Sequence, residues 1–150
     1  MFPVVKLSPR KERQLEREYE MQAVAEPNVF KTVQASALGN TALWTPATGK
    51  KFRLMRLIVQ IPANVSLAAR GVLTISFQDN TTDISLTFDH YVGQTAPVET
   101  ASSEQPNFDT GWIDLGNGIV STTANNVLNV NLSAALAAGK VRITCCGTEE

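Results

Sequence analysis

Hydrophobic residues are densest between Phe52 and Ile61, where the sequence reads FRLMRLIVQI. In an extended chain both faces of this run are apolar, with Met55, Leu57, Val59 and Ile61 on one face and Phe52, Leu54 and Ile58 on the other. The run is too short and too rich in branched side chains for a core helix, so it predicts a central strand that is buried on both faces. Pro62 ends the strand, because proline cannot donate a hydrogen bond to a neighbouring strand.

Two later segments alternate between apolar and polar residues. Residues 72–78 and 84–91 are separated by Asp79-Asn80-Thr81-Thr82, a typical turn sequence. The apolar positions are Leu73, Ile75, Phe77, Ile84, Leu86 and Phe88. This pattern predicts an antiparallel hairpin with one face on the core and the other in solvent.

Shorter segments of the same period complete the predicted fold. They cover residues 30–36, 42–45, 112–115, 119–123, 128–132 and 141–145. Gly116-Asn117-Gly118 predicts a tight hairpin turn between two of them. About eight to nine short strands without strand–helix alternation predict an all-β fold, an antiparallel β-sandwich of jelly-roll type. Residues 92–110 are the longest irregular stretch, and we expect an exposed functional loop there.

The first 28 residues differ from the rest, so we expect an arm over residues 1–28 and a β-sandwich domain over residues 29–150. MFPVVKL is a short apolar tip, Ser8-Pro9 is typical of a helix N-terminus, and helix-forming residues continue to Glu26-Pro27. One interpretation is a lightly docked helix with a solvated charged face. The other is an arm that becomes ordered against a neighbouring subunit. In the second, the contact residues are Phe2, Val4, Val5, Leu7, Leu15 and Tyr19.

Composition narrows the classes of partner. The 150 residues carry a net charge of −1, without the basic surplus expected of a nucleic-acid-binding protein. Charged residues make up 18%, which is low and favours a surface partly covered by a partner. No apolar run has the length of a membrane span, and the N-terminus lacks the apolar region of a secretory signal. We therefore expect neither nucleic acid nor membrane as a partner.

Cys145 and Cys146 are the only cysteines. Neighbouring residues of a strand point to opposite faces, a geometry in which the two sulfurs do not easily bond. We expect free thiols made in a reducing compartment, with Cys145 facing inward and Cys146 outward. A metal or redox site at this pair is the less favoured alternative, because no other cysteine and only one histidine are present to complete it.

The remaining candidate chemistry is sparse, and we predict no catalytic residue, no metal ligand and no cofactor. His90 is the only histidine and no Gly-x-Ser-x-Gly motif accompanies it, which favours a structural or surface role. Asp79 and Asp83 are interpreted as solvated turn residues rather than calcium ligands, since the EF-hand spacing is absent. Trp44 and Trp112 are candidates for a sugar-binding platform, or else both pack at the edge of the sandwich.

The sequences ALWTPATGKKFRLMRLIVQI, FDTGWIDLGNGIV and NVLNVNLSAALAAGKVRIT carry a resemblance to a known class of proteins. Between Ala42 and Thr144 the chain resembles small β-sandwich virion proteins of tailed bacteriophages, namely capsid decoration (cement) proteins and related head or tail accessory subunits. The resemblance implies a non-enzymatic structural protein of the virion, commonly a trimer on the outside of the shell. It also implies a terminal arm that reaches neighbouring subunits, with the major capsid protein or other virion subunits as partners.

Three classes of function follow from these observations. The first is a virion structural subunit that is made in the host cytoplasm and stabilises the shell through its N-terminal arm. The second is a carbohydrate- or receptor-binding β-sandwich module of a phage tail or head fibre. The third is an enzyme whose site the sequence does not reveal. The first is preferred, because no catalytic motif is present while an arm and a lightly charged surface are.

Overall fold

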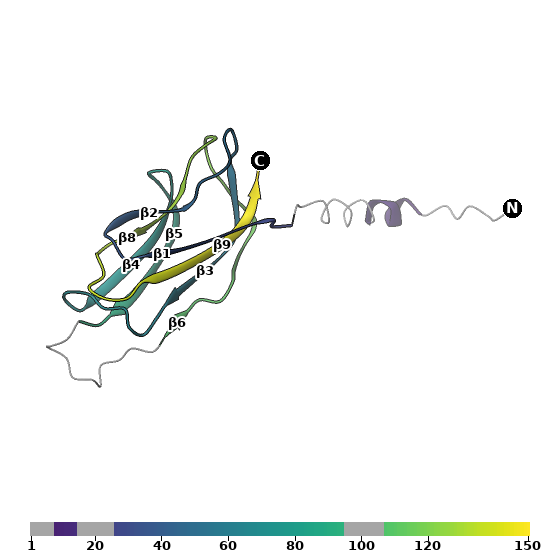
Figure 1. The fold of residues 1–150 in the computed structure, drawn as a ribbon. Coiled ribbons are helices and arrows are strands. Elements are labelled where there is room, and N and C mark those ends of the chain that lie inside the picture. Colours follow the sequence, from purple (N-terminus) through teal and green to yellow (C-terminus); the bar gives the residue numbers. More distant parts are fainter. Residues whose placement is uncertain (1–7, 15–25, 95–106) are drawn as a thin grey trace.

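The computed structural model describes residues 8–14, 26–94 and 107–150, and it is an all-β sandwich (Figure 1). Two antiparallel sheets, one of five strands and one of four, pack against each other. The five-stranded sheet contains β1 (Val29–Ala35), β3 (Phe52–Ile61), β6 (Phe108–Asp109), β7 (Ile113–Val120) and β9 (Val141–Glu149). The four-stranded sheet contains β2 (Gly39–Trp44), β4 (Gly71–Asp79), β5 (Thr82–Val92) and β8 (Leu128–Leu132).

The strand order confirms the predicted jelly roll. The larger sheet has the order β1-β9-β3-β6, with β7 also paired to β3, and the smaller sheet has the order β2-β8-β4-β5. Early strands therefore pair with late ones, β1 with β9, β2 with β8 and β3 with β7, while β4 pairs with the adjacent β5. The chain folds as one long antiparallel ribbon whose tip is the turn at Asn80–Thr81, and the ribbon is wound into two sheets, as in a jelly roll.

Side chains from both sheets fill the space between them. The largest fully buried ones include Trp44, Phe52, Phe77, Leu54, Leu57, Leu73, Ile75, Leu128, Leu132 and Ile143. The predicted hairpin is confirmed as β4 and β5, with the inward side chains Leu73, Ile75 and Phe77 buried and Ile84, Leu86 and Phe88 half-buried against the core. In a regular strand every second side chain points to the same face, so the alternating sequence of β4 and β5 predicted which of their residues lie in the core.

Strand β3 lies in the middle of its sheet as predicted, but it is not buried on both faces. A β-bulge lies between Leu54 and Arg56, so that Met55 has no partner on β9. The bulge inserts one extra residue into β3. Residues before the bulge therefore point to the opposite face from the one they would have in an unbroken strand. Phe52 and Leu54 consequently join Leu57 and its successors in the core. The opposite face carries Arg53, Arg56, Ile58 and Gln60, none of them fully buried.

The expected hairpin turn at Gly116-Asn117-Gly118 is wrong. All three residues lie within β7, and both flanks of the segment pair with the same strand, β3, rather than with each other. The three residues span the register shift opposite the bulge of β3. A Cβ atom on Gly118 would lie 2.8 Å from the Leu54 carbonyl oxygen, and φ is +87° there, so this close approach needs glycine.

The two ends of the predicted irregular segment are more ordered than expected. Val92 ends β5 and is fully buried, while Phe108–Asp109 forms the short strand β6 beside Gln60 and Ile61. Residues 95–106, the greater part of the expected exposed loop, lie outside the described residues. The loop expectation therefore stays a prediction for that segment.

Candidate functional site

The described part of the arm begins as the sequence predicts. Residues 9–14 are helical, the Ser8 hydroxyl accepts a hydrogen bond from the Lys11 N–H at 3.4 Å, and the Glu12 N–H donates to the Ser8 carbonyl at 3.0 Å. Ser8 is therefore the N-cap, with Pro9 at the first helical position. Residues 8–14 are all exposed. The predicted contact residues Phe2, Val4, Val5, Leu7, Leu15 and Tyr19 lie outside the described residues.

Trp44 belongs to the core. It is 1% exposed, its ring centroid lies 5.9 Å from that of Phe52, and its Nε1–H donates a 3.0 Å hydrogen bond to Glu149 Oε1. A buried indole usually finds such a polar partner for its N–H. Trp44 offers no ring face to a sugar, so the proposed sugar-binding platform would depend on Trp112 alone.

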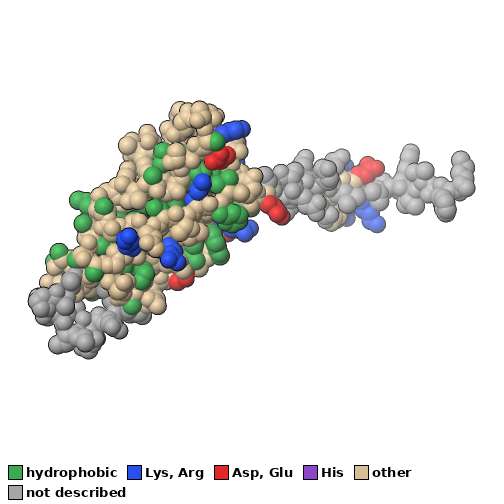
Figure 2. All heavy atoms as spheres, viewed as in Figure 1, with side chains coloured by type: hydrophobic (Ala, Val, Ile, Leu, Met, Phe, Trp, Pro, Cys, Tyr) green, Lys and Arg blue, Asp and Glu red, His purple; other side chains and the backbone are tan. Residues whose placement is uncertain are grey.

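Trp112 directly precedes β7 on the outer face of the five-stranded sheet and is 53% exposed, while Phe30 on β1 is 65% exposed. One row of the sheet runs across four strands through Phe30, Cys146, Arg56 and Asp114. We call these four residues and Trp112 the aromatic patch. Together with Glu26 and Pro27 they line a hollow of about 630 Å³. Figure 2 shows hydrophobic side chains gathered on this side of the sandwich.

Charges in the aromatic patch are few and balanced. Arg56 Nε lies 4.0 Å from Asp114 Oδ2, and both side chains are more than half exposed. An ion pair of this length in solvent contributes little to stability. The two exposed aromatic rings and the arginine instead belong to residue types that are enriched in protein interfaces.

The two cysteines are free thiols on opposite faces of β9, as predicted. Cys145 lies in the core, whereas Cys146 lies on the outer face in the floor of the aromatic patch. The outward Cys146 is nevertheless only 2% exposed, and this burial raises the pKa of its thiol above the ordinary value of 9.0. Burial, reinforced by Cys146, raises the pKa of the Cys145 thiol to about 12.

The raised pKa of Cys145 predicts a loss of stability at alkaline pH. An unfolded thiol ionises near 9.0 while the folded one stays protonated to about 12, so its contribution is complete below pH 9 and is lost as the pH rises toward 12. The slope for one such group is about 1.4 kcal/mol per pH unit. Urea unfolding between about pH 8 and pH 10.5 should show a steeper loss for the natural chain than for Cys145→Ala. Equal slopes would contradict this prediction.

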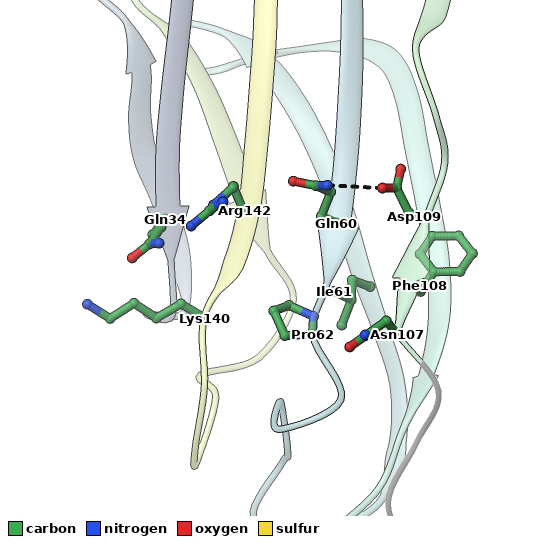
Figure 3. A pocket seen from close by; sticks show the side chains of 9 residues that line it. All are labelled: Gln34, Gln60, Ile61, Pro62, Asn107, Phe108, Asp109, Lys140 and Arg142. Carbon is green, nitrogen blue, oxygen red and sulfur yellow. Dashed lines mark hydrogen bonds between the residues drawn. The ribbon is translucent and has the colours of Figure 1, made fainter.

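A second hollow, of about 380 Å³, lies at the other end of the same sheet face (Figure 3). Its lining residues are Gln34, Gln60, Ile61, Pro62, Asn107, Phe108, Asp109, Lys140 and Arg142. Gln60 donates a 3.0 Å hydrogen bond to Asp109. This bond, together with one from the Gly111 N–H, lowers the pKa of the Asp109 carboxyl below its ordinary value of 3.8. Gln34, Lys140 and Arg142 have no side-chain partner in the described ranges and lie across from Asp109 in Figure 3. We call this the polar hollow.

The expectation of solvated carboxylates at the hairpin tip is wrong for Asp79. Asp79 is 3% exposed and accepts hydrogen bonds from the Thr122 N–H (2.7 Å), the Thr122 hydroxyl (2.8 Å) and the Asn126 amide (2.9 Å). These bonds join the tip of the ribbon to the segment before β8. The only indication in the sequence that Asp79 is buried is its position, two residues after Phe77 and on the same strand face as Leu73 and Ile75.

The other candidate residues fit structural roles. His90 stacks on Phe108 with ring centroids 4.5 Å apart, and Asp83 accepts a bond from the Ser85 N–H at 2.7 Å, as in an Asx-turn. Across residues 8–14, 26–94 and 107–150, no group of three or more His, Cys, Asp or Glu side chains is arranged to hold a metal ion. Over the same ranges every buried polar side-chain atom has a hydrogen-bond partner, and no helix is long and apolar enough to cross a bilayer.

Two features of one sheet face thus remain as candidate sites, the aromatic patch and the polar hollow. Among the lining residues, the sequence identified Trp112 and Cys146 as candidates, and the expected functional loop 92–110 contains Asn107, Phe108 and Asp109. The other members come from distant parts of the chain and form no local motif. Comparison with known proteins adds no further candidate. No protein-family model matches this sequence, and no curated protein is detectably similar to it.

Proposed function

We propose that this chain is a non-enzymatic structural subunit of a phage virion, a capsid decoration protein that binds the outside of the shell through its N-terminal arm. The observation that carries the proposal is the aromatic patch, because Glu26 and Pro27 at the root of the arm line the same hollow as Phe30 and Trp112. A binding surface that adjoins the root of an arm suits a subunit that contacts several neighbours at once. Such contacts add through avidity, so none of them has to be strong alone.

The rest of the molecule supports an assembly role. The jelly roll is a fold that viral capsid proteins and lectins share, although a fold alone does not determine function. The buried carboxylate of Asp79 is occupied by internal hydrogen bonds from Thr122 and Asn126, which fits a structural role for that residue. We propose the major capsid protein or another virion subunit as partner, a homo-oligomer with a trimer favoured, and the virion as location.

Phage particles assembled without this chain test the proposal. The full chain should co-sediment with them and raise the temperature at which they release DNA, because added bridges between subunits stabilise a lattice. A chain that begins at Asn28 keeps every core residue, yet it should bind at least about tenfold more weakly because it lacks the arm's contacts. Leu38→Ser is the matched control, since Leu38 is exposed but lies outside the aromatic patch. Failure of the full chain to bind any such particle would refute the proposal.

A carbohydrate- or receptor-binding module of a phage fibre is the second candidate, and the polar hollow favours it. Amide, carboxylate and guanidinium groups that surround a shallow hollow suit the hydroxyl groups of a saccharide. Gln34, Lys140 and Arg142 are exposed there. The test is binding of the full chain to immobilised glycans. Binding that is lost in Arg142→Ala but retained in Arg70→Ala would favour this function over the first.

A further inference from the structure

We infer that the aromatic patch is the docking surface for the apolar N-terminal segment, residues 1–7, of a second copy of this chain. The inference deepens the proposed function and rests on its assignment of a binding role to the arm. It names the partner of that arm as another copy, so that arms exchanged between copies build the oligomer.

The receiving surface has the composition of an interface centre. Phe30 and Trp112 are more than half exposed and line the hollow together, whereas the other large exposed hydrophobic side chains in the described ranges, Leu38, Val72 and Tyr91, lie outside it. A hollow of about 630 Å³ has the size of sites that take small ligands or a few side chains. Its floor is the buried Cys146, so the centre of the contact would be apolar.

The occupant follows from hydrophobicity and charge. Residues 1–7, MFPVVKL, carry six apolar side chains and a single charged one, Lys6. A segment this short cannot bury its own apolar surface, so it needs a surface to cover it. Asp114 and Glu26 at the rim of the hollow are acidic, and Arg56 is its basic residue. Because Arg56 is paired with Asp114, the negative charge of Glu26 is left over. The rim therefore complements the lysine of the segment while the rings take its valine and leucine side chains.

The length of the arm favours a second copy over the same chain. The described helix starts at Pro9, and the sequence predicts that it continues to Ala25, just before the root of the arm at Glu26-Pro27. A straight helix of that length would be about 25 Å long. It would place residues 1–7 that far from their own hollow and within reach of a neighbour. Mutual exchange of arms generates closed dimers or rings, which is how identical subunits assemble.

The test is the mass of the full chain by light scattering at about 100 µM, a concentration that saturates a complex with a dissociation constant of about 1 µM. The natural chain should be oligomeric. Three variants should weaken the oligomer, so that on dilution each becomes monomeric at a concentration at least about tenfold higher than the natural chain does. They are Phe30→Ser, Trp112→Ala and a four-serine variant in which Phe2, Val4, Val5 and Leu7 are all changed to serine. Leu38→Ser, in the turn between β1 and β2, should keep the natural mass.

Acrylamide quenching of tryptophan fluorescence gives a local readout. Trp44 is buried, so quenching reports mainly on Trp112. The four-serine variant should make Trp112 more accessible than in the natural chain, while Leu38→Ser should not. A natural chain that is monomeric at about 100 µM would overturn the inference. If the four-serine variant of such a monomer were quenched more strongly than the natural chain, each arm would be covering the aromatic patch of its own chain. A four-serine variant with natural mass would overturn it as well. No phage particle is needed, so failed shell binding is a separate result.

Discussion

Replacing Gly147 by alanine is expected to destabilise the sandwich by about 3 kcal/mol or more, beyond the usual cost of overpacking a core. Gly147 pairs with Leu54 across the bulge between β9 and β3. A Cβ atom there would overlap the carbonyl oxygen of Arg53 and approach the Trp44 ring at 3.1 Å. Neither neighbour has room to move, because one is sheet backbone and the other is a buried indole. Urea unfolding followed by tryptophan fluorescence measures the loss.

Gly71→Ala is the matched control for Gly147→Ala. Gly71 also lies in a strand, at the start of β4, and an added Cβ would have no atom within 4 Å. The change should alter the free energy of unfolding by no more than about 0.5 kcal/mol, the usual range for surface positions. Similar unfolding midpoints for the two variants would show that β3 and β9 move apart more easily than the packing indicates.

Removing the carboxylate of Asp79 is expected to cost about 2–4 kcal/mol, because hydrogen bonds to a charged group contribute more than neutral ones and the lost carboxylate leaves its donors unpaired. In Asp79→Ala the Thr122 N–H and hydroxyl lose their acceptor, and the Asn126 amide keeps only its 3.3 Å bond to the Thr122 hydroxyl. The segment before β8 should loosen first, since these bonds fix it to the hairpin tip. Urea unfolding gives the global cost, and faster hydrogen exchange at the Thr122 amide reports the local one.

Asp89→Ala is the control for the Asp79 prediction. Asp89 is exposed on the same hairpin and accepts one bond, from the Thr74 hydroxyl at 2.6 Å. A single solvent-exposed bond of this kind should contribute about 1 kcal/mol or less. If Asp89→Ala cost as much as Asp79→Ala, burial of Asp79 and its three donors would not be the source of its effect.

The candidate sites were harder to predict than the fold. Trp112 was identified as a candidate because exposed aromatic residues bind ligands, but Trp44 satisfied the same criterion and is buried in the core. Nothing local in the sequence separates the two tryptophans. Their burial depends on what packs over each ring, and for Trp44 this is Phe52, Glu149 and the backbone near Gly147. The role of residues 1–7 stays a prediction.

By itself, the sequence determined the fold class and most of the core. Alternation with period two places every second side chain on one face, so residues such as Leu73, Ile75 and Phe77 could be assigned to the core before any pairing was known. The Ser8-Pro9 helix start was equally local, because a cap and its helix are neighbours in the chain. These features depend only on residues a few positions apart.

Only the tertiary structure decided where that alternation breaks and which distant residues meet. The bulge in β3 depends on pairing with β9 and β7, and the glycines that suggest a hairpin turn instead lie in β7 because both flanks pair with β3. Likewise Asp79 is buried by the segment around Thr122, and Phe30, Trp112 and Cys146 line one hollow because β1, β9, β3 and β7 are adjacent in one sheet. A jelly roll pairs the beginning of the chain with its end, so the two candidate sites form only when the ribbon closes.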